Sequence, residues 1–169
     1  MTNIRRIPLE DFFKKPEKVM VRISPSGKYL SWMEPWKRRL NVHVKNTETD
    51  EIKRVTNATE RDLYGYGWAN HERIIYAMDD GGDENTRLYG VNYDGLNPLE
   101  FTPYKNVKCD IVDVLKNDDM HIFFQMNKRD EKVFDIFRLN VNTGDMEKIA
   151  ENPGNVSNWI ADHDGKLRL

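Results

Sequence analysis

The run YLSWM at residues 29–33 decides the fold, because two similar runs follow it in this 169-residue chain. They read IIYAM at residues 74–78 and IFFQM at residues 122–126. Each run ends in a methionine, and these methionines lie 45 and 48 positions apart. Aromatic and branched residues are typical of β-strands. Their recurrence at a nearly constant spacing indicates one structural unit that repeats along the chain.

A polar turn precedes each run, and a strand with alternating apolar residues follows it. The turns read SPSG at residues 24–27, NHE at residues 70–72, NDD at residues 117–119 and, a fourth time, DHDG at residues 162–165. Clusters of this type reverse the chain between strands. Two sets of residues are therefore predicted to occupy equivalent places in the three units: Met33, Met78 and Met126, and Val44, Val91 and Leu139.

Every unit closes with a further short strand, near residues 52–56, 99–102 and 146–150, and so contains four strands. Four antiparallel strands in 40 to 50 residues are typical of one β-propeller blade. We predict an all-β fold, a partial β-propeller of about three and a half four-stranded antiparallel blades. The expected limits are residues 1–18 for an N-terminal segment, 19–60 for blade 1, 61–107 for blade 2, 108–155 for blade 3 and 156–169 for the start of a truncated blade 4.

A β-sandwich is the alternative fold. It would show alternating strands without a near-constant spacing of equivalent side chains, so the repeat favours the propeller. Helical periodicity is almost absent, apart from a turn or two expected near residues 9–14.

Composition excludes several classes of protein. The formal net charge of −2 gives no broad basic field for nucleic acid. No apolar run approaches the roughly 20 residues that cross a membrane, and the polar first 18 residues do not read as a signal peptide. We therefore expect a cytoplasmic protein without a cofactor. Cys109 is the single cysteine and is expected to be a small core residue.

Five stretches carry a resemblance to a known family. They read IPLEDFF at residues 7–13, ISPSGKY at 23–29, DDGGDEN at 79–85, NPGN at 152–155 and WIADHDGKLR at 159–168. Together they resemble the N-terminal propeller of bacterial prolyl oligopeptidase family serine peptidases, of the acylaminoacyl and dipeptidyl peptidase type. The turn around Pro25 is a weak signal alone, and the combination is more specific.

The resemblance implies a parent enzyme in which a propeller caps a C-terminal α/β-hydrolase domain with a Ser-Asp-His triad. A nucleophile elbow reads Gly-x-Ser-x-Gly, and none of the four serines in this chain has that setting. We therefore expect no catalytic residues here. The expected role is to gate and restrict short peptides that reach the hydrolase domain, and open blade edges suggest self-association. A stand-alone propeller that binds a protein partner is the alternative.

The acidic loop at residues 79–85 is the most unusual local chemistry. Its carboxylates are predicted either to stabilise the loop, by accepting backbone N–H groups or pairing with Arg87, or to bind a hard cation. A third reading follows from the resemblance, because related dipeptidyl peptidases hold a substrate's N-terminal ammonium with propeller glutamates. Asp83, Glu84 and Asn85 are the candidate substrate-binding residues.

The remaining candidates favour structural interpretations. Four histidines lie in different strands or turns without metal-ligand spacing, so no metal site is expected. His163 sits in a repeated turn, where a turn hydrogen bond is the expected role. The four tryptophans recur with the blades, as packing between blades predicts. The basic cluster at residues 37–39 is expected to be a solvated turn.

Overall fold

The computed structural model describes residues 7–13 and 17–168 and is almost entirely β-structure. Within these residues one short helix, α1 (Leu9–Phe13), precedes fourteen strands, and it lies where the sequence predicts a turn or two of helix, near residues 9–14. The strands are β1 (Val19–Ile23), β2 (Tyr29–Trp36), β3 (Arg39–Asn46), β4 (Ile52–Arg54), β5 (Gly65–Trp68), β6 (Arg73–Met78), β7 (Arg87–Asn92), β8 (Leu99–Glu100), β9 (Cys109–Asp113), β10 (His121–Asp130), β11 (Val133–Asn140), β12 (Met146–Ala150), β13 (Ile160–Ala161) and β14 (Leu167–Arg168).

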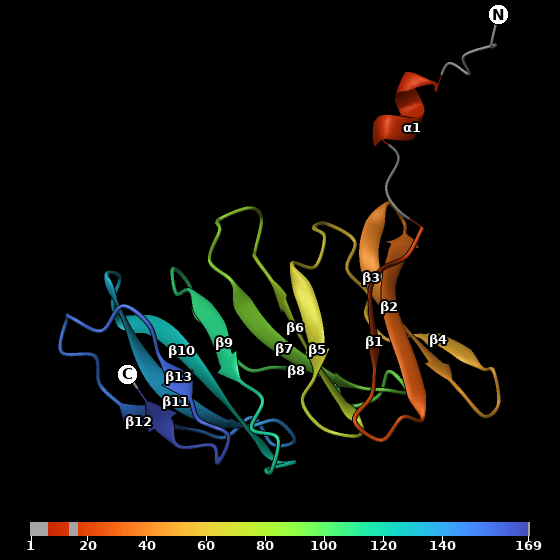
Figure 1. The fold of residues 1–169 in the computed structure, drawn as a ribbon. Coiled ribbons are helices and arrows are strands. Elements are labelled where there is room, and N and C mark those ends of the chain that lie inside the picture. The colour runs from red at the N-terminus through yellow and green to blue at the C-terminus, as the bar shows by residue number, and fades with distance from the viewer. Residues whose placement is uncertain (1–6, 14–16, 169) are drawn as a thin grey trace, which may run out of the picture.

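The strands form three four-stranded antiparallel meanders and one two-stranded sheet. The orders are β1-β2-β3-β4, β5-β6-β7-β8, β12-β11-β10-β9 and β13-β14, so every sheet follows the chain without a crossover. The sheets stand side by side as successive blades and do not close into a ring (Figure 1). The predicted partial propeller of about three and a half blades is confirmed. We refer to these sheets as blades 1 to 4.

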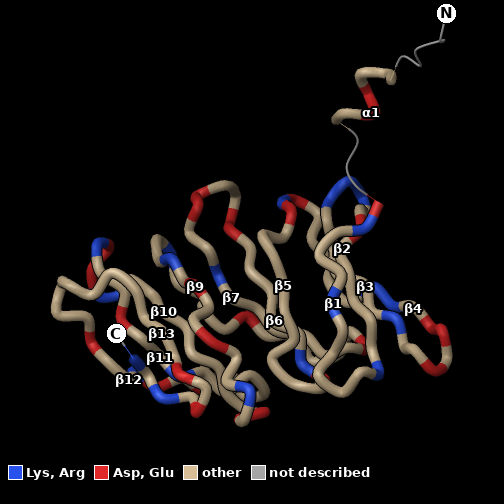
Figure 2. Tube along the Cα trace, viewed as in Figure 1, with Lys and Arg blue, Asp and Glu red and all other residues tan. Residues whose placement is uncertain are grey.

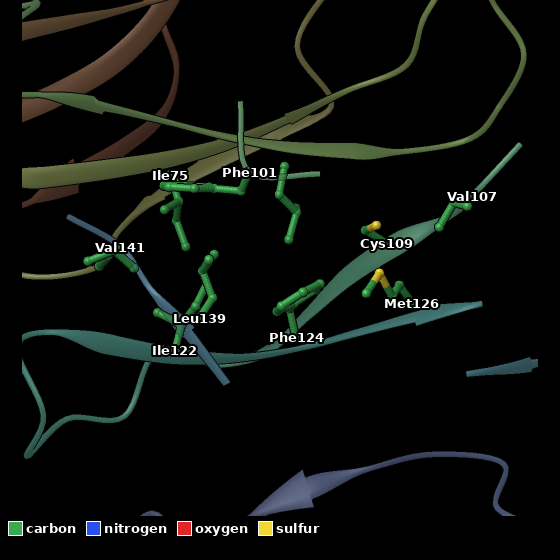
Figure 3. Packing of buried hydrophobic residues seen from close by; sticks show 11 residues of the cluster. Ile75, Phe101, Val107, Cys109, Ile122, Phe124, Met126, Leu139 and Val141 are labelled. Atoms are coloured by element: carbon green, nitrogen blue, oxygen red, sulfur yellow. The ribbon is translucent and has the colours of Figure 1, made fainter. Parts of the chain in front are cut away.

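The hydrophobic core lies between neighbouring blades. The cluster between blades 2 and 3 contains Ile75 and Phe101 on one side and Ile122, Phe124 and Leu139 on the other, with their side chains interdigitated (Figure 3). A second cluster joins blades 1 and 2, and a third joins blades 3 and 4. Blades 2 and 3 therefore contact a neighbouring blade on both faces of their middle strands, which explains why these strands are apolar in the sequence.

Three asparagines occupy the same position in blades 1, 2 and 3. They show which residues of these blades are equivalent. They end β3, β7 and β11, and each backbone N–H donates across the following turn at 2.8 to 3.0 Å. Each asparagine also pairs with the first residue of the preceding strand. The pairs are Asn46 with Tyr29, Asn92 with Arg73 and Asn140 with His121.

When positions are counted from these pairs, the two predicted sets of equivalent residues do not align in all three blades. The members from blade 1 are displaced by one residue, so the prediction is wrong for blade 1. Met78 and Met126 are both five residues after the first residue of their strands, whereas Met33 is four residues after Tyr29. Val44 is displaced from Val91 and Leu139 in the same way.

A shift of one residue turns a side chain to the other face of its sheet. Met33 and Val44 accordingly pack toward blade 2, in the cluster between blades 1 and 2. Met126 and Leu139 pack back toward blade 2, the blade that precedes theirs. The structural repeat is therefore present, but the spacing of the methionines alone does not identify which residues of the three blades are equivalent.

A buried arginine connects blades 2 and 3. Arg73 is only 2% exposed, and its Nε donates to the carbonyl oxygen of Val141 at 2.8 Å. Its Nη1 donates to Asn92 Oδ1 at 2.8 Å and to the carbonyl oxygen of Asn97 at 2.7 Å. Burial lowers the pKa of Arg73. The guanidinium lies over the Phe101 ring, with 5.7 Å between its central carbon and the ring centroid.

Gly90 lies against this arginine, and its replacement by alanine is expected to destabilise the protein. A Cβ at Gly90 would stand 2.5 Å from Phe101 Cζ and 2.9 Å from Arg73 Nη2. Because both neighbours are held in a packed core, Gly90→Ala is expected to lower the free energy of unfolding by about 1 to 3 kcal/mol. Denaturant unfolding measures this change.

The matched control is Gly67→Ala, another strand glycine with no heavy atom within 4 Å of its added Cβ. That change is expected to be neutral or to stabilise by roughly 0.5 kcal/mol, because alanine loses less backbone entropy than glycine. Equal unfolding free energies for the two variants would contradict the packing described around Gly90.

Candidate functional site

The acidic loop at residues 79–85 connects β6 and β7 in blade 2. It leaves the blade at the end opposite the turn between β5 and β6 (Figure 1). Figure 2 shows its acidic positions along this loop at the rim of the molecule. Gly81 and Gly82 have φ values of 65° and 89°, and Glu84 adopts a φ of 60°. The two glycines permit this tight path, because most other residues disfavour positive φ.

The first carboxylate of the loop is fixed inside the structure. The Asp79 side chain is only 1% exposed, and Arg61 donates to both of its oxygens, with Nε–Oδ1 and Nη2–Oδ2 distances of 3.2 Å. Burial by itself raises the pKa of Asp79, but hydrogen bonds from Arg61 and Tyr64 outweigh it and hold the pKa below its usual value. Asp79 therefore stabilises the base of the loop.

Two further loop carboxylates also have partners within the chain. Arg87 Nη2 lies 3.2 Å from Asp80 Oδ2. Asp83 Oδ1 accepts the backbone N–H of Asn85 at 3.0 Å, and Oδ2 accepts its side-chain amide at 3.3 Å. The backbone N–H of Asn85 is the main cause that lowers the pKa of Asp83. These contacts agree with the structural interpretation of the loop.

Glu84 is the loop carboxylate that remains available to a ligand. Its residue is exposed, and within residues 7–13 and 17–168 no hydrogen bond or ion pair involves its carboxylate. Asp83 is exposed beside it, so two carboxylates reach solvent at the tip of the loop. The same described residues contain no group of three or more histidine, cysteine or acidic side chains arranged to hold a metal ion.

A cavity of about 560 Å³ lies between blades 3 and 4, and the sequence did not single it out. Leu115 and Phe123 contribute buried apolar walls, while Arg138 and His163 contribute polar ones. His163 itself lies in its turn, and Asn117 Nδ2 is 3.5 Å from its backbone carbonyl oxygen.

One side of this cavity holds a small charged cluster. Arg138 Nη2 donates to Asp118 Oδ2 at 2.7 Å, and His121 Nδ1 lies 2.9 Å from the same oxygen. Burial raises the pKa of Asp118, but the hydrogen bonds from Arg138 and His121 outweigh it and lower the pKa to about 2. A spacing of three residues between Asp118 and His121 was the available sequence signal, whereas Arg138 comes from another strand.

This lowered pKa predicts acid sensitivity. Because the folded pKa of Asp118 lies below its usual value, its stabilising contribution is present at neutral pH and is lost as the pH falls toward 2. Asp118→Asn is expected to lower the free energy of unfolding by about 2 kcal/mol at pH 6, and the difference from wild type should shrink below pH 4. Urea unfolding over this pH range measures it.

The control for that experiment is Asp119→Asn. Asp119 is the exposed neighbour, with a side chain 68% exposed, and its substitution is expected to change stability by less than about 0.5 kcal/mol. The difference in free energy of unfolding between the wild type and Asp118→Asn should shrink as the pH falls. A difference that stays constant between pH 6 and pH 2 would contradict the stabilising role assigned to the Asp118 carboxylate.

The cysteine and the tryptophans named in the sequence analysis have packing roles. Cys109 is fully buried, and burial raises the pKa of its thiol to about 11, as expected for a core residue. Trp68 and Trp159 are buried in the clusters between blades. Trp36 instead contacts two cations, with the Arg54 guanidinium carbon 3.5 Å and Lys37 Nζ 4.6 Å from its ring centroid.

Comparison with known proteins identifies relatives of this chain in sequence and in fold. The chain matches no family model. It is 30% identical over 164 residues to dipeptidyl aminopeptidase BIII of Pseudoxanthomonas mexicana, covering 96% of this chain and 24% of that protein. The chain is homologous to part of a dipeptidyl peptidase. It is also 26% identical over 174 residues to dipeptidyl peptidase family member 6 of Caenorhabditis elegans, covering 96% of this chain and 23% of that protein.

A solved structure gives the same fold. The β-propeller domain of the Trilobed protease from Pyrococcus furiosus superposes with a TM-score of 0.57 at 18% identity, covering 86% of this chain and 46% of that domain. The resemblance to propeller regions of prolyl oligopeptidase family peptidases is therefore confirmed. The chain spans about a quarter of the length of the curated relatives that it matches. No helix among the described residues is long and apolar enough to cross a membrane.

Proposed function

We propose that this chain is the non-catalytic propeller segment of a serine peptidase and restricts which peptides reach a C-terminal α/β-hydrolase domain. The observation that supports the proposal is the 30% identity to a dipeptidyl aminopeptidase over 96% of the chain. The proposed restriction is steric. A row of blades over an active site admits a flexible oligopeptide and excludes a folded protein, so selectivity arises from an unfavourable contact with the wrong substrate.

The chain itself lacks the residues for acyl transfer. Its serines are Ser24, Ser26, Ser31 and Ser157, and none is flanked by glycines as in a nucleophile elbow. Ser24 and Ser31 are buried at 2% and 0% exposure. A serine peptidase needs a nucleophile, a base and an oxyanion hole together. In this proposal the hydrolase domain supplies all three.

The experiment compares the isolated chain with the longer protein that contains it. The isolated chain is expected to release no chromophore from aminoacyl or dipeptidyl chromogenic substrates, and the longer protein is expected to hydrolyse them. Substitution of the serine in a Gly-x-Ser-x-Gly motif beyond residue 169 should abolish that hydrolysis. Turnover by the isolated chain that is lost on mutating one of its own residues would contradict the proposal.

A stand-alone propeller that binds a protein partner is the second candidate, and the absence of a nucleophile from this sequence favours it equally. A coding sequence without a Gly-x-Ser-x-Gly motif after residue 169 would select this candidate. A cytoplasmic location also stays a prediction, supported by the single cysteine of the chain.

A further inference from the structure

We propose that the cavity between blades 3 and 4 is the seat of a later segment of the longer protein, namely the third strand of blade 4 and the turn that follows it. This inference rests on the part of the proposed function that extends the chain beyond residue 169. Two observations support it. The cavity lies where the earlier interfaces hold the third strand of the following blade, and its volume is too large for a completed interface between blades.

At both interfaces between the first three blades, the chain just past the third strand of one blade contacts the start of the second strand of the preceding blade. The ring of Tyr93, one residue after the end of β7, stacks on that of Tyr29 with 4.3 Å between their centroids. The carbonyl oxygen of Val141, one residue after the end of β11, accepts the hydrogen bond from Arg73 Nε. Tyr29 and Arg73 are the first residues of β2 and β6, so the two contacts are equivalent.

The turn after the third strand makes a second repeated contact. Gly95 of blade 2 lies against Val55 of blade 1, since a Cβ at Gly95 would stand 3.8 Å from Val55 Cα. Gly144 of blade 3 lies against Phe101 of blade 2, since a Cβ at Gly144 would stand 3.8 Å from Phe101 Cδ1. Val55 and Phe101 both lie nine residues after the asparagine that ends the third strand of their blade, and they are only 4% and 3% exposed.

Blade 3 presents the same position to the cavity. Ile149 lies nine residues after Asn140, and an irregularity in the pairing of β11 with β12 places Ile149 and Ala150 together opposite Ile136. Ile149 lines the cavity and is 40% exposed. The position that the following blade buries in blades 1 and 2 is therefore exposed in blade 3.

The size and the walls of the cavity fit an apolar strand. Within the described residues blade 4 comprises β13 and β14, so no counterpart of β7 or β11 stands over the cavity among them. Protein interiors contain few voids larger than a water molecule, whereas this cavity measures about 560 Å³ and has apolar walls from Leu115 and Phe123. His121, the first residue of β10, is the counterpart of Tyr29 and Arg73, and we expect it to contact the residue one past the missing strand.

The repeat also gives the position of the segment in the longer sequence. The first residue of the second strand and the asparagine that ends the third are 17, 19 and 19 positions apart in blades 1, 2 and 3. Lys166 is the corresponding first residue in blade 4, because its carbonyl oxygen accepts from the N–H of Asp162 as that of Arg73 accepts from Ala69. The third strand of blade 4 is therefore expected to end 17 to 19 residues after Lys166, with an apolar residue on each side of its last residue. Charged residues at both flanking positions would contradict the proposal.

The test measures access to the cavity in the longer protein by alkylation with iodoacetamide, followed at each cysteine by peptide mass spectrometry. Ile149→Cys is expected to react at least about 100-fold more slowly than Leu96→Cys, because a packed strand must open before the reagent reaches the thiol. Leu96→Cys is the matched control, since Leu96 is 61% exposed in the turn between β7 and β8. Cys109 is fully buried between blades 2 and 3, and its slow reaction establishes that each variant is folded.

A second variant identifies the occupant of the cavity. Alanine is introduced in place of the apolar residue one past the third strand of blade 4, the counterpart of Tyr93 and Val141. This truncation leaves space between the blades and is expected to raise the alkylation rate of Ile149→Cys by at least about tenfold.

Two results of the alkylation experiment would overturn the proposal. Equal rates for Ile149→Cys and Leu96→Cys would mean that the cavity stays open in the longer protein. Slow alkylation of Ile149→Cys that the alanine variant leaves unchanged would mean that another part of the protein covers the cavity. The outcome is separate from that of the proposed function, because alkylation rates do not depend on peptidase activity.

Discussion

Phe124→Ala is expected to lower the free energy of unfolding by about 4 kcal/mol, the largest effect of any single change considered for this protein. Phe124 is fully buried between blades 2 and 3, and its ring centroid lies 5.5 Å from that of Phe137. Its truncation leaves a cavity in the cluster drawn in Figure 3. The loss combines the transfer of the ring with the contacts that its neighbours lose.

Urea unfolding followed by fluorescence measures this loss, and Phe13→Ala is the control. Phe13 lies in α1 and is 79% exposed, so its substitution is expected to change stability by less than about 0.5 kcal/mol. Equal effects of the two substitutions would show that blades 2 and 3 do not share a packed interface.

The second large effect concerns the tip of the acidic loop. In the longer protein, combined Asp83→Asn and Glu84→Gln is expected to raise KM for peptides with a free N-terminal amine by roughly tenfold or more, since the loss of an ion pair of about 1.4 kcal/mol corresponds to a tenfold change. Peptides with a blocked amine should be unaffected. Two exposed carboxylates stand at the tip of the loop, and Glu84 has no partner among the described side chains.

Steady-state kinetics with free and blocked peptides measures the effect, and thermal unfolding accompanies it. Asp80→Asn is the matched control in the same loop, because Asp80 already pairs with Arg87. If both peptide types lose activity equally and the melting temperature falls, the loop has only the structural role that its internal contacts support.

The sequence predicts the blades because their strands repeat in composition and each turn carries its own signal. The asparagines at positions 46, 92 and 140 illustrate this, since each ends a strand and donates its backbone N–H across the next turn. Methionine spacing misplaces blade 1 by one residue, because a methionine fits either face of a buried strand. Turn residues have a single permitted position and are therefore the better markers of register.

Contacts between distant parts of the chain could not be predicted from the sequence. Arg61 and Asp79 are 18 residues apart, and Arg73 reaches the carbonyl oxygen of Val141 68 residues away. The sequence marks Asp79 as acidic and Arg73 as basic, which favours solvent exposure for both. Only the three-dimensional structure shows that each is buried and has a partner, Asp79 at the base of its own loop and Arg73 across the boundary between blades 2 and 3.

We propose that this propeller segment limits substrates by size. The direct measurement is kcat/KM of the longer protein for two substrates that share one peptide sequence. One substrate is the free peptide, and the other carries the same peptide as the flexible N-terminal end of a stably folded domain. We expect kcat/KM to be lower by roughly 100-fold for the folded fusion, equivalent to about 2.7 kcal/mol of steric exclusion, and to recover when the fused domain is unfolded by mutation. Equal values for the peptide and the folded fusion would contradict it.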